Sequence, residues 1–189
     1  MRKHNNPHVP TSQFEPEFSK LVALYVDLNP KTVLEIGTEY GGTLWHWTHE
    51  ALPGTKIANI EPAVVRGYGC ILPLMWQSWL PKGVELQTIQ GYSQDAHIES
   101  QVIQYLGDEI DFCFIDGDHT YKGVVQDWFT YGIRSKVVVL HDLIRHKPHF
   151  GVGRLFNELK PKYKTDEFWS HAPGKQNGGG IGVVYVNTN

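Results

Sequence analysis

The sequence predicts an α/β fold, a doubly wound, mostly parallel, Rossmann-like sheet with a C-terminal antiparallel strand pair. Three observations support this. Short apolar runs alternate with segments of helical periodicity from residue 14 onward. The runs at 110–115 and 136–140 are almost wholly apolar, as is typical of parallel strands buried on both faces. Acidic and imidazole side chains follow the strands directly, at the edge where ligands bind in open α/β sheets.

The predicted elements alternate regularly along the chain. An amphipathic helix over residues 14–28 comes first, and Asn29 and Pro30 end its pattern. Strands are then predicted at 32–36, 56–60, 84–89, 110–115 and 136–140, with helices at 43–52, 94–106 and 121–131. This alternation predicts right-handed crossovers, so the carboxyl ends of the strands are expected to converge.

The last third of the chain changes character. A helix is predicted at 153–159, followed by strands near 163–169 and 181–186 that pair antiparallel because no helix separates them. Residues 63–81 predict a loop with a short helix over one sheet face, which can also cover a ligand. Residues 1–12 lack periodicity and are therefore expected to form a flexible arm. Residues 13–189 are expected to form one domain.

Composition limits the classes of function. The 189 residues are 41% hydrophobic, enough for one core, and the net charge is only −3 with scattered basic residues. Neither nucleic acid nor a membrane is therefore expected as a partner. Cys70 and Cys113 do not form a disulfide framework pattern, so reduced thiols are expected. No apolar run approaches the ~18 residues of a membrane span and no signal peptide is visible, which predicts a cytoplasmic protein.

A cofactor site is predicted where the first strand turns through glycines into a helix. Gly37 and Gly41 let the backbone approach a ligand and expose helix N-terminal amides. Their spacing differs from the dinucleotide Gly-x-Gly-x-x-Gly pattern, and a tight turn without a ligand is the simpler alternative. Glu61 follows the next strand about 20 residues later, as expected of an acid that accepts ribose hydroxyls. A solvated surface glutamate is the alternative there.

Residues 35–37 (Glu-Ile-Gly) followed by Gly41 are similar to the first motif of class I methyltransferases that use S-adenosylmethionine (SAM). The resemblance implies that the cofactor is bound by residues of this turn and by the acid after the second strand. These positions are Glu35, Gly37, Thr38, Gly41 and Glu61.

Residues 91–95 (Gly-Tyr-Ser-Gln-Asp) are similar to the Gly-x-Ser-Gln-Asp segment of catechol O-methyltransferases. In that segment the Ser and Gln positions meet the adenine, which implies the same role for Ser93 and Gln94. An N-cap on a surface helix is the alternative for Ser93.

The run at 115–124, which contains Asp-Gly-Asp-His-Thr-Tyr, together with His141 and Asp142, resembles a more specific group. This is the methyltransferase family 24-like group of cephalosporin hydroxylase-like and macrolide sugar O-methyltransferase enzymes, and the resemblance extends from about residue 14 to 186. It implies a metal held by Asp116, His141 and Asp142. It also implies that Asp116 adjoins the cofactor and takes part in catalysis, and that His119 is the general base.

The chemistry of these side chains leaves alternatives open. Carboxylates on adjacent strand ends suit Mg²⁺, whereas His141 stands where the relatives carry a carboxylate, and imidazole suits zinc, iron or manganese better. His141 and Asp142 could instead be a structural pair that caps a turn. The ordinary pKa of His119 suits proton abstraction, but a satisfied histidine at a helix N-terminus is its alternative. Asp118 is expected to cap the helix that begins near Tyr121.

The sequence thus predicts a SAM-dependent methyltransferase that O-methylates a small hydroxylated acceptor, a sugar or secondary metabolite, with Mg²⁺ or another divalent metal. The alternative is a non-catalytic binding module with a partner interface, suggested by Trp76 and Trp79, which could also join a homodimer. A nicotinamide-linked oxidoreductase lacks the glycine spacing, and metal-dependent oxygenation lacks a clear iron ligand set. Four other histidines lack a third ligand at metal spacing and are expected at the surface or in a loop: His46, His49, His146 and His149.

Overall fold

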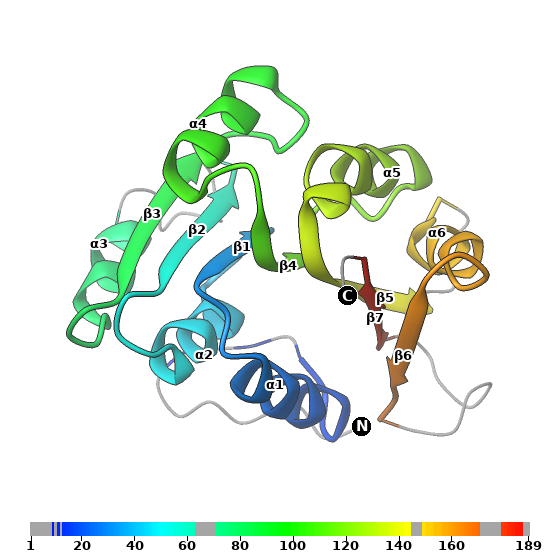
Figure 1. The fold of residues 1–189 in the computed structure, drawn as a ribbon, viewed down its shortest axis with the longest axis horizontal. Helices are drawn as coiled ribbons and strands as arrows, with labels where there is room; N and C mark the ends of the chain where they lie inside the picture. Colours follow the sequence, from blue (N-terminus) through cyan, green and yellow to red (C-terminus); the bar gives the residue numbers. More distant parts are fainter. Residues whose placement is uncertain are drawn as a thin grey trace.

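The computed structural model describes residues 9, 11, 13–62, 71–144, 149–170 and 179–186. They form one seven-stranded sheet in the order β3-β2-β1-β4-β5-β7-β6 (Figure 1). The strands are β1 (Thr32–Ile36), β2 (Lys56–Glu61), β3 (Glu85–Gln90), β4 (Ile110–Ile115), β5 (Ser135–Ile144), β6 (Lys164–Phe168) and β7 (Gly179–Tyr185). The first five run parallel, and β7 pairs antiparallel with both β5 and β6, which confirms the predicted fold class.

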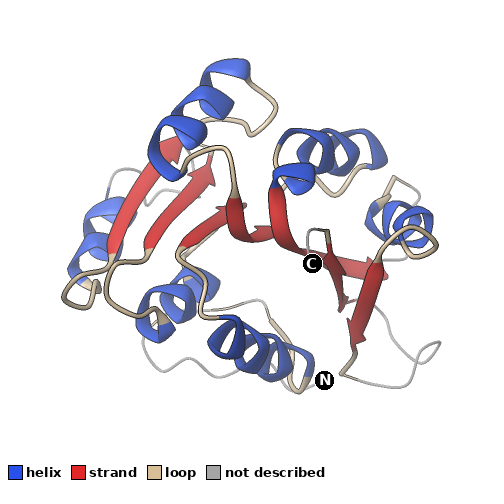
Figure 2. Ribbon diagram, in the orientation of Figure 1, coloured by secondary structure: helices blue, strands red, loops and turns tan. Residues whose placement is uncertain are grey.

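Six α-helices cover the two faces of this sheet (Figure 2). They are α1 (Glu17–Leu28), α2 (Gly42–Glu50), α3 (Ile71–Ser78), α4 (Ala96–Leu106), α5 (Tyr121–Thr130) and α6 (Val152–Leu159), and a 3₁₀ turn spans Gly132–Arg134. In Figure 1, α1, α2 and α3 lie on one side of the sheet and α4, α5 and α6 on the other. Each layer buries its apolar stripe against one sheet face, so the domain has two cores.

The two cores differ in the side chains that fill them. Aromatic rings dominate the α1–α2 side, where Tyr25, Trp47 and Phe112 pack with ring centroids about 5 Å apart and the Tyr25 hydroxyl donates to the Trp47 carbonyl. Aliphatic residues of α4 and α6 dominate the opposite side. Cys113 lies in this second core, and its burial raises the pKa of the thiol, so a reactive thiolate is not available there.

The bounds of the predicted elements agree with the observed ones to within three residues, except at the end of β5. Strand β5 continues to Ile144, four residues beyond its predicted end, because it pairs with β7 past a bulge. The short helix predicted within 63–81 is α3, and its Trp76 is only 1% exposed. The indole packs against Gly41 and donates to the Tyr40 carbonyl at 3.2 Å. The suggestion that Trp76 is an exposed interface residue is therefore wrong, while Trp79 is half-buried.

Several predictions fall on residues outside the described ranges: most of the arm at 1–12, together with Cys70 and His146. The flexible arm, the homodimer, the absence of nucleic acid and the cytoplasmic location stay predictions. Val9 is buried. Among the described helices, none has both the length and the apolar composition that crossing a bilayer requires.

A backbone contact joins the ends of β1 and β4. Gly37 has φ +87°, and a Cβ added there would lie 2.3 Å from the carbonyl oxygen of Asp116. The amide of Asp116 also donates to the carbonyl of Ile36 at 2.8 Å. Glycine is required at position 37 both by its dihedral and by this close approach.

Gly37→Ala should destabilise the protein by about 3 kcal/mol or more, because strain and a backbone clash add. The matched control is Gly54→Ala, since Gly54 has φ +90° but nothing within 4 Å of the added Cβ. It should cost only about 1 kcal/mol, the strain alone. Urea unfolding measures both, and equal losses would show that the β1–β4 contact yields without cost.

Candidate functional site

A cavity of about 650 Å³ opens at the carboxyl ends of the parallel strands. Glu61 and the 91–94 segment line one end, and the residues that follow β4, together with those near the end of β5, line the other. Its walls are formed by Ile36, Gly37, Glu39, Ile60, Glu61, Pro62, Gly91, Tyr92, Ser93, Gln94, Asp116, Gly117, Asp118, His119, His141 and Asp142. Eight of the residues predicted for cofactor, metal or catalysis thus share one cavity.

Glu61 is fixed by the glycine turn. Its Oε2 accepts the backbone N–H groups of Thr38 at 2.7 Å and Glu39 at 2.8 Å, and neither bond uses Oε1. Burial raises the pKa of Glu61, although the two amide donors oppose that shift. The carboxylate is therefore held in one orientation beside the cavity, which a solvated surface glutamate would not be.

The other residues predicted for the first motif lie behind the cavity wall. Glu35 is fully buried, and both its oxygens lack a hydrogen-bond partner among the described residues. Its burial, and then the charges of Asp116 and Glu61, raise the pKa of Glu35 well above its usual range. Thr38 lines a small neighbouring hollow and accepts from Asn59, while Gly41 faces Trp76. These three positions can shape the turn, but they do not line the main cavity.

The segment predicted to meet adenine is held by a residue that sequence reasoning missed. Asp127 of α5 is buried, and its Oδ1 accepts from the Ser93 hydroxyl at 2.7 Å and from Gln94 Nε2 at 3.1 Å. The Tyr131 hydroxyl donates to the Ser93 carbonyl at 2.8 Å. Ser93 is buried and Asp95 occupies the N-cap position of α4, so the surface-cap alternative for Ser93 is wrong.

A sequence signal for Asp127 existed. It lies on the same helical stripe as the buried Val124 and Trp128, and an acid on an apolar stripe requires a partner. Its burial, opposed by the bond from Ser93, raises the pKa of Asp127 to about 6.

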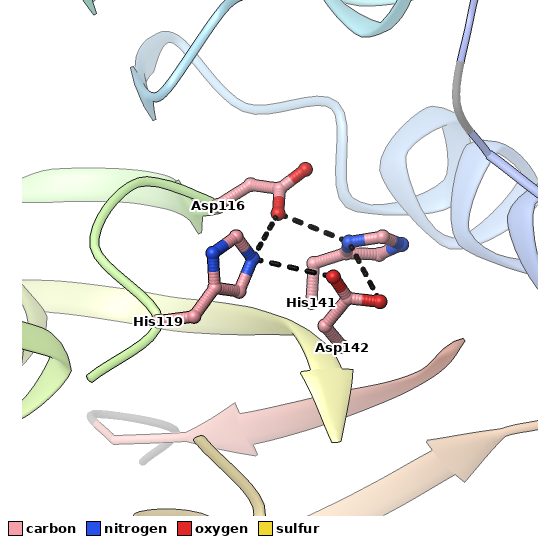
Figure 3. A group of neighbouring side chains, drawn as sticks. All are labelled: Asp116, His119, His141 and Asp142. Carbon is pink, nitrogen blue, oxygen red and sulfur yellow. Dashed lines mark hydrogen bonds and ion pairs between the residues drawn. The ribbon is translucent and has the colours of Figure 1, made fainter. Parts of the chain in front are cut away.

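Four side chains at the other end of the cavity point toward one another (Figure 3). Nε2 of His119 lies 3.0 Å from Oδ1 of Asp116 and 3.3 Å from Oδ2 of Asp142. Nδ1 of His141 lies 3.0 Å from the same Asp116 oxygen and 3.8 Å from Oδ1 of Asp142. One ligand atom from each residue fits within a span of 4.8 Å, so a single metal ion can reach all four.

The bulge in β5 makes this cluster possible. Neighbouring side chains of a regular strand point to opposite faces, so His141 and Asp142 could not both meet Asp116. The β5–β7 register shifts between His141 and Ile144, and Asp142 has φ +64°. This irregularity turns both side chains toward the end of β4, at the cost of strained backbone at a non-glycine residue.

Electrostatics tie the cluster together. Burial alone would raise the pKa of Asp116, but the charges and hydrogen bonds of His141 and His119 hold it well below its usual range. Burial alone would lower the pKa of His119, but bonds to Asp116 and Asp142 raise it to about 9. The pKa of His141 is raised as well, against its burial, chiefly by the charge of Asp116. In this arrangement the positive charge of the protonated imidazoles balances the negative charge of the carboxylates.

Two further expectations at this edge are wrong. The N-cap of α5 is Thr120, whose Oγ1 accepts the Gly123 N–H at 3.1 Å, and Asp118 instead accepts the Thr120 N–H at 2.9 Å. This follows because α5 begins at Tyr121, one residue after Thr120. His46 is buried, with its ring against Phe18 and Trp45, and is no surface residue.

Gln13 was not expected at the site. It is only 2% exposed, and its Nε2 lies 3.4 Å from Oδ2 of Asp116. The nearby Glu17 of α1 accepts the backbone N–H groups of Ser170 and Gly180. The segment that leads into α1 therefore lies against the cavity, an arrangement that no local sequence pattern indicates.

Comparison with known proteins shows which of them share this architecture. No protein-family model matches the chain. An uncharacterised protein of Acanthamoeba polyphaga mimivirus is 34% identical over 103 residues, a match that covers 53% of this chain but only 44% of that protein's length. The O-methyltransferase TomG from Streptomyces achromogenes, solved in complex with SAM, superposes with a TM-score of 0.68 at 16% identity, over 96% of this chain and 83% of its own. The chain shares the fold of this O-methyltransferase.

A second structure agrees with the first. The O-methyltransferase from Bacillus cereus, in complex with SAH, matches with a TM-score of 0.66 at 19% identity, over 93% of this chain and 84% of that one. In this methyltransferase fold, the cavity described above lies at the carboxyl edge of the sheet, where α/β sheets bind ligands.

The raised pKa of His119 predicts how stability depends on pH in metal-free protein. The folded-state pKa of about 9 exceeds the ordinary 6.5, so the folded state binds the extra proton. Its contribution is complete below pH 6.5 and is lost as the pH rises to 9. The free energy of unfolding should fall over that window by about 2 to 3 kcal/mol.

Urea unfolding in EDTA at several pH values measures this dependence. His119→Gln removes the titrating group, so its free energy of unfolding should decline much less over the same window. An equal decline in the variant would assign the effect to other groups.

Proposed function

We propose that the protein is a SAM-dependent methyltransferase that transfers a methyl group to an oxygen of a small hydroxylated acceptor, such as a sugar or secondary metabolite. The observation that carries the proposal is one cavity that joins Glu61 and the Ser93–Gln94 segment to the Asp116–His119–His141–Asp142 cluster. The proteins that share this fold include O-methyltransferases solved with SAM or SAH.

The cofactor half of the cavity suits the nucleoside part of SAM. Glu61 presents an oriented carboxylate, and a carboxylate at this position after the second strand can accept the hydroxyls of a ribose. Ser93 and Gln94 flank the same cavity at the adenine end, with Asp127 holding both side chains. Gly37 lets the chain pass close to the ligand. Glu35, Thr38 and Gly41 support the turn from behind.

The reacting half suits removal of one proton from an acceptor hydroxyl. SAM supplies the methyl group as an electrophile, so the protein's task is alignment and proton removal. Asp116, His141 and Asp142 are proposed to hold a divalent metal, which supplies a positive charge that lowers the pKa of a nearby hydroxyl. The donor set fits such an ion because two carboxylates and an imidazole converge within its reach.

His119 is the proposed general base. Asp116 and Asp142 keep a proton on it in the present arrangement, with a pKa of about 9. His119 can take up the acceptor's proton only when another cation balances these two carboxylates, so base and metal site depend on each other. Phe150 stacks on the His119 ring with centroids 5.0 Å apart, which limits the ring to one orientation.

The proposed cofactor is tested by calorimetric titration of the purified protein with SAM, and with NAD in parallel. SAM should bind and NAD should not, and Glu61→Ala should weaken SAM binding by about 2 kcal/mol or more, because hydrogen bonds to a charged group are lost. Glu50→Ala, at an exposed acid that ends α2, is the matched control and should bind SAM normally.

Methyl transfer itself is then followed with methyl-labelled SAM and a panel of sugars and phenols. Absence of SAM binding to the unaltered protein would overturn the proposal. Binding that survives in Glu61→Ala would remove the ribose role of Glu61 alone.

A positioning role for Asp127 can be tested in the same assay. Asp127→Ala frees Ser93 and Gln94, so SAM affinity should fall about tenfold, the equivalent of about one lost hydrogen bond, while the saturated rate changes little. Phe129→Ala, at a 62% exposed residue of the same helix, is the control. A loss confined to the saturated rate would contradict a role in holding the adenine segment.

A further inference from the structure

We propose that the Asp116–His141–Asp142 site selects a transition-metal dication of the manganese, iron, cobalt and zinc class over magnesium, and that the imidazole of His141 sets this preference. The inference rests on the proposed function in using the same site, but it concerns which ion the chain is built to hold.

The geometry places nitrogen among the donors. Nδ1 of His141 is directed at the carboxylates of Asp116 and Asp142, at 3.0 and 3.8 Å (Figure 3). His119 adds a second imidazole within the same 4.8 Å span. An ion that accepts ligands from this cluster therefore meets at least one nitrogen donor and two carboxylates.

Magnesium is a poor match for that donor set. It prefers six oxygen ligands in a near-ideal octahedron and keeps several waters. The side chains of His141 and Asp142 are 3% and 1% exposed, so these two ligands would hold an ion against the buried wall of the cavity. Imidazole suits zinc, iron, cobalt and manganese, for which mixed nitrogen and oxygen ligand sets are common.

His141 cannot easily leave the ligand position. Its backbone pairs with Ile181 of β7, on the edge of the β5 bulge, and its ring lies against Phe114 with centroids 6.0 Å apart. The burial of the side chain and this ring contact restrict rotation of the imidazole away from the site. Nδ1 is the ring nitrogen that lies beside the two carboxylates, whereas Nε2 of His141 lacks a hydrogen-bond partner among the described residues.

The test compares ion preference in two matched proteins. The full chain is stripped with EDTA and titrated calorimetrically with Mg²⁺, Mn²⁺ and Co²⁺, and the ratio of the Mg²⁺ to the Co²⁺ dissociation constant is recorded. Sites with nitrogen and oxygen ligands generally bind the later metals more tightly, so the ratio alone proves little. His141→Glu replaces the nitrogen donor with an oxygen donor and should lower this ratio by at least about tenfold.

His97→Glu, at an exposed histidine of α4, makes the same chemical change away from the site and should leave the ratio unchanged. An unchanged ratio in His141→Glu would overturn the proposal, as would a finding that neither Mn²⁺ nor Co²⁺ binds the unaltered protein. SAM titration of the same metal-free preparation separates this failure from failure of the proposed function, because the cofactor half uses other residues.

A second measurement does not depend on how well His141→Glu folds. Pulsed EPR of the Mn²⁺-loaded protein labelled with ¹⁵N-histidine detects nitrogen bound directly to the metal. It is carried out in a His119→Gln background, so that His141 is the remaining histidine of the cluster. A directly bound nitrogen is expected, and its absence would overturn the proposal.

Discussion

Charge balance among buried side chains is the constraint on which the rest of this site depends. Asp116 and Asp142 lie near the ends of neighbouring strands, and their side chains are 18% and 1% exposed. Carboxylates in such surroundings are stable only beside a positive charge or several hydrogen-bond donors. The imidazoles of His119 and His141 supply the positive charge and the donors, and both contact the same oxygen of Asp116. Under the proposed function, proton, metal and acceptor chemistry at this edge would all act on that one balance.

At the opposite end of the cavity, two carboxylates also need hydrogen-bond donors to offset their burial. Glu61 is stabilised by backbone amides of the glycine turn, and Asp127 by a hydroxyl and a side-chain amide. None of these contacts is an ion pair. The cavity therefore presents neutral donors and one oriented carboxylate where a nucleoside would bind, and the ionic cluster where a methyl group would be transferred. Under the proposed function, this separation would divide cofactor recognition from methyl transfer along the sheet edge.

The sequence predicted the parts of this arrangement that depend on local pattern. Strand and helix periodicity located nearly every element, and the position of Glu61 after the second strand predicted its place beside the cavity. The β5 bulge was not predictable, because the apolar run at 136–140 shows no sign of the pairing with β7 that causes it. Gln13 and Trp76 were also missed, since their burial depends on contacts with segments far away in the chain.

The position of β7 has a consequence for how the protein matures during synthesis. This last strand inserts between β5 and β6, pairs with His141, and receives the Glu17 carboxylate on its Gly180 amide. Until the ribosome has synthesised β7, β5 has no neighbour on that side and the Glu17 carboxylate of α1 lacks its Gly180 donor. The Glu61 end of the cavity can form earlier, but the charged cluster acquires its final shape only once β7 has paired with β5.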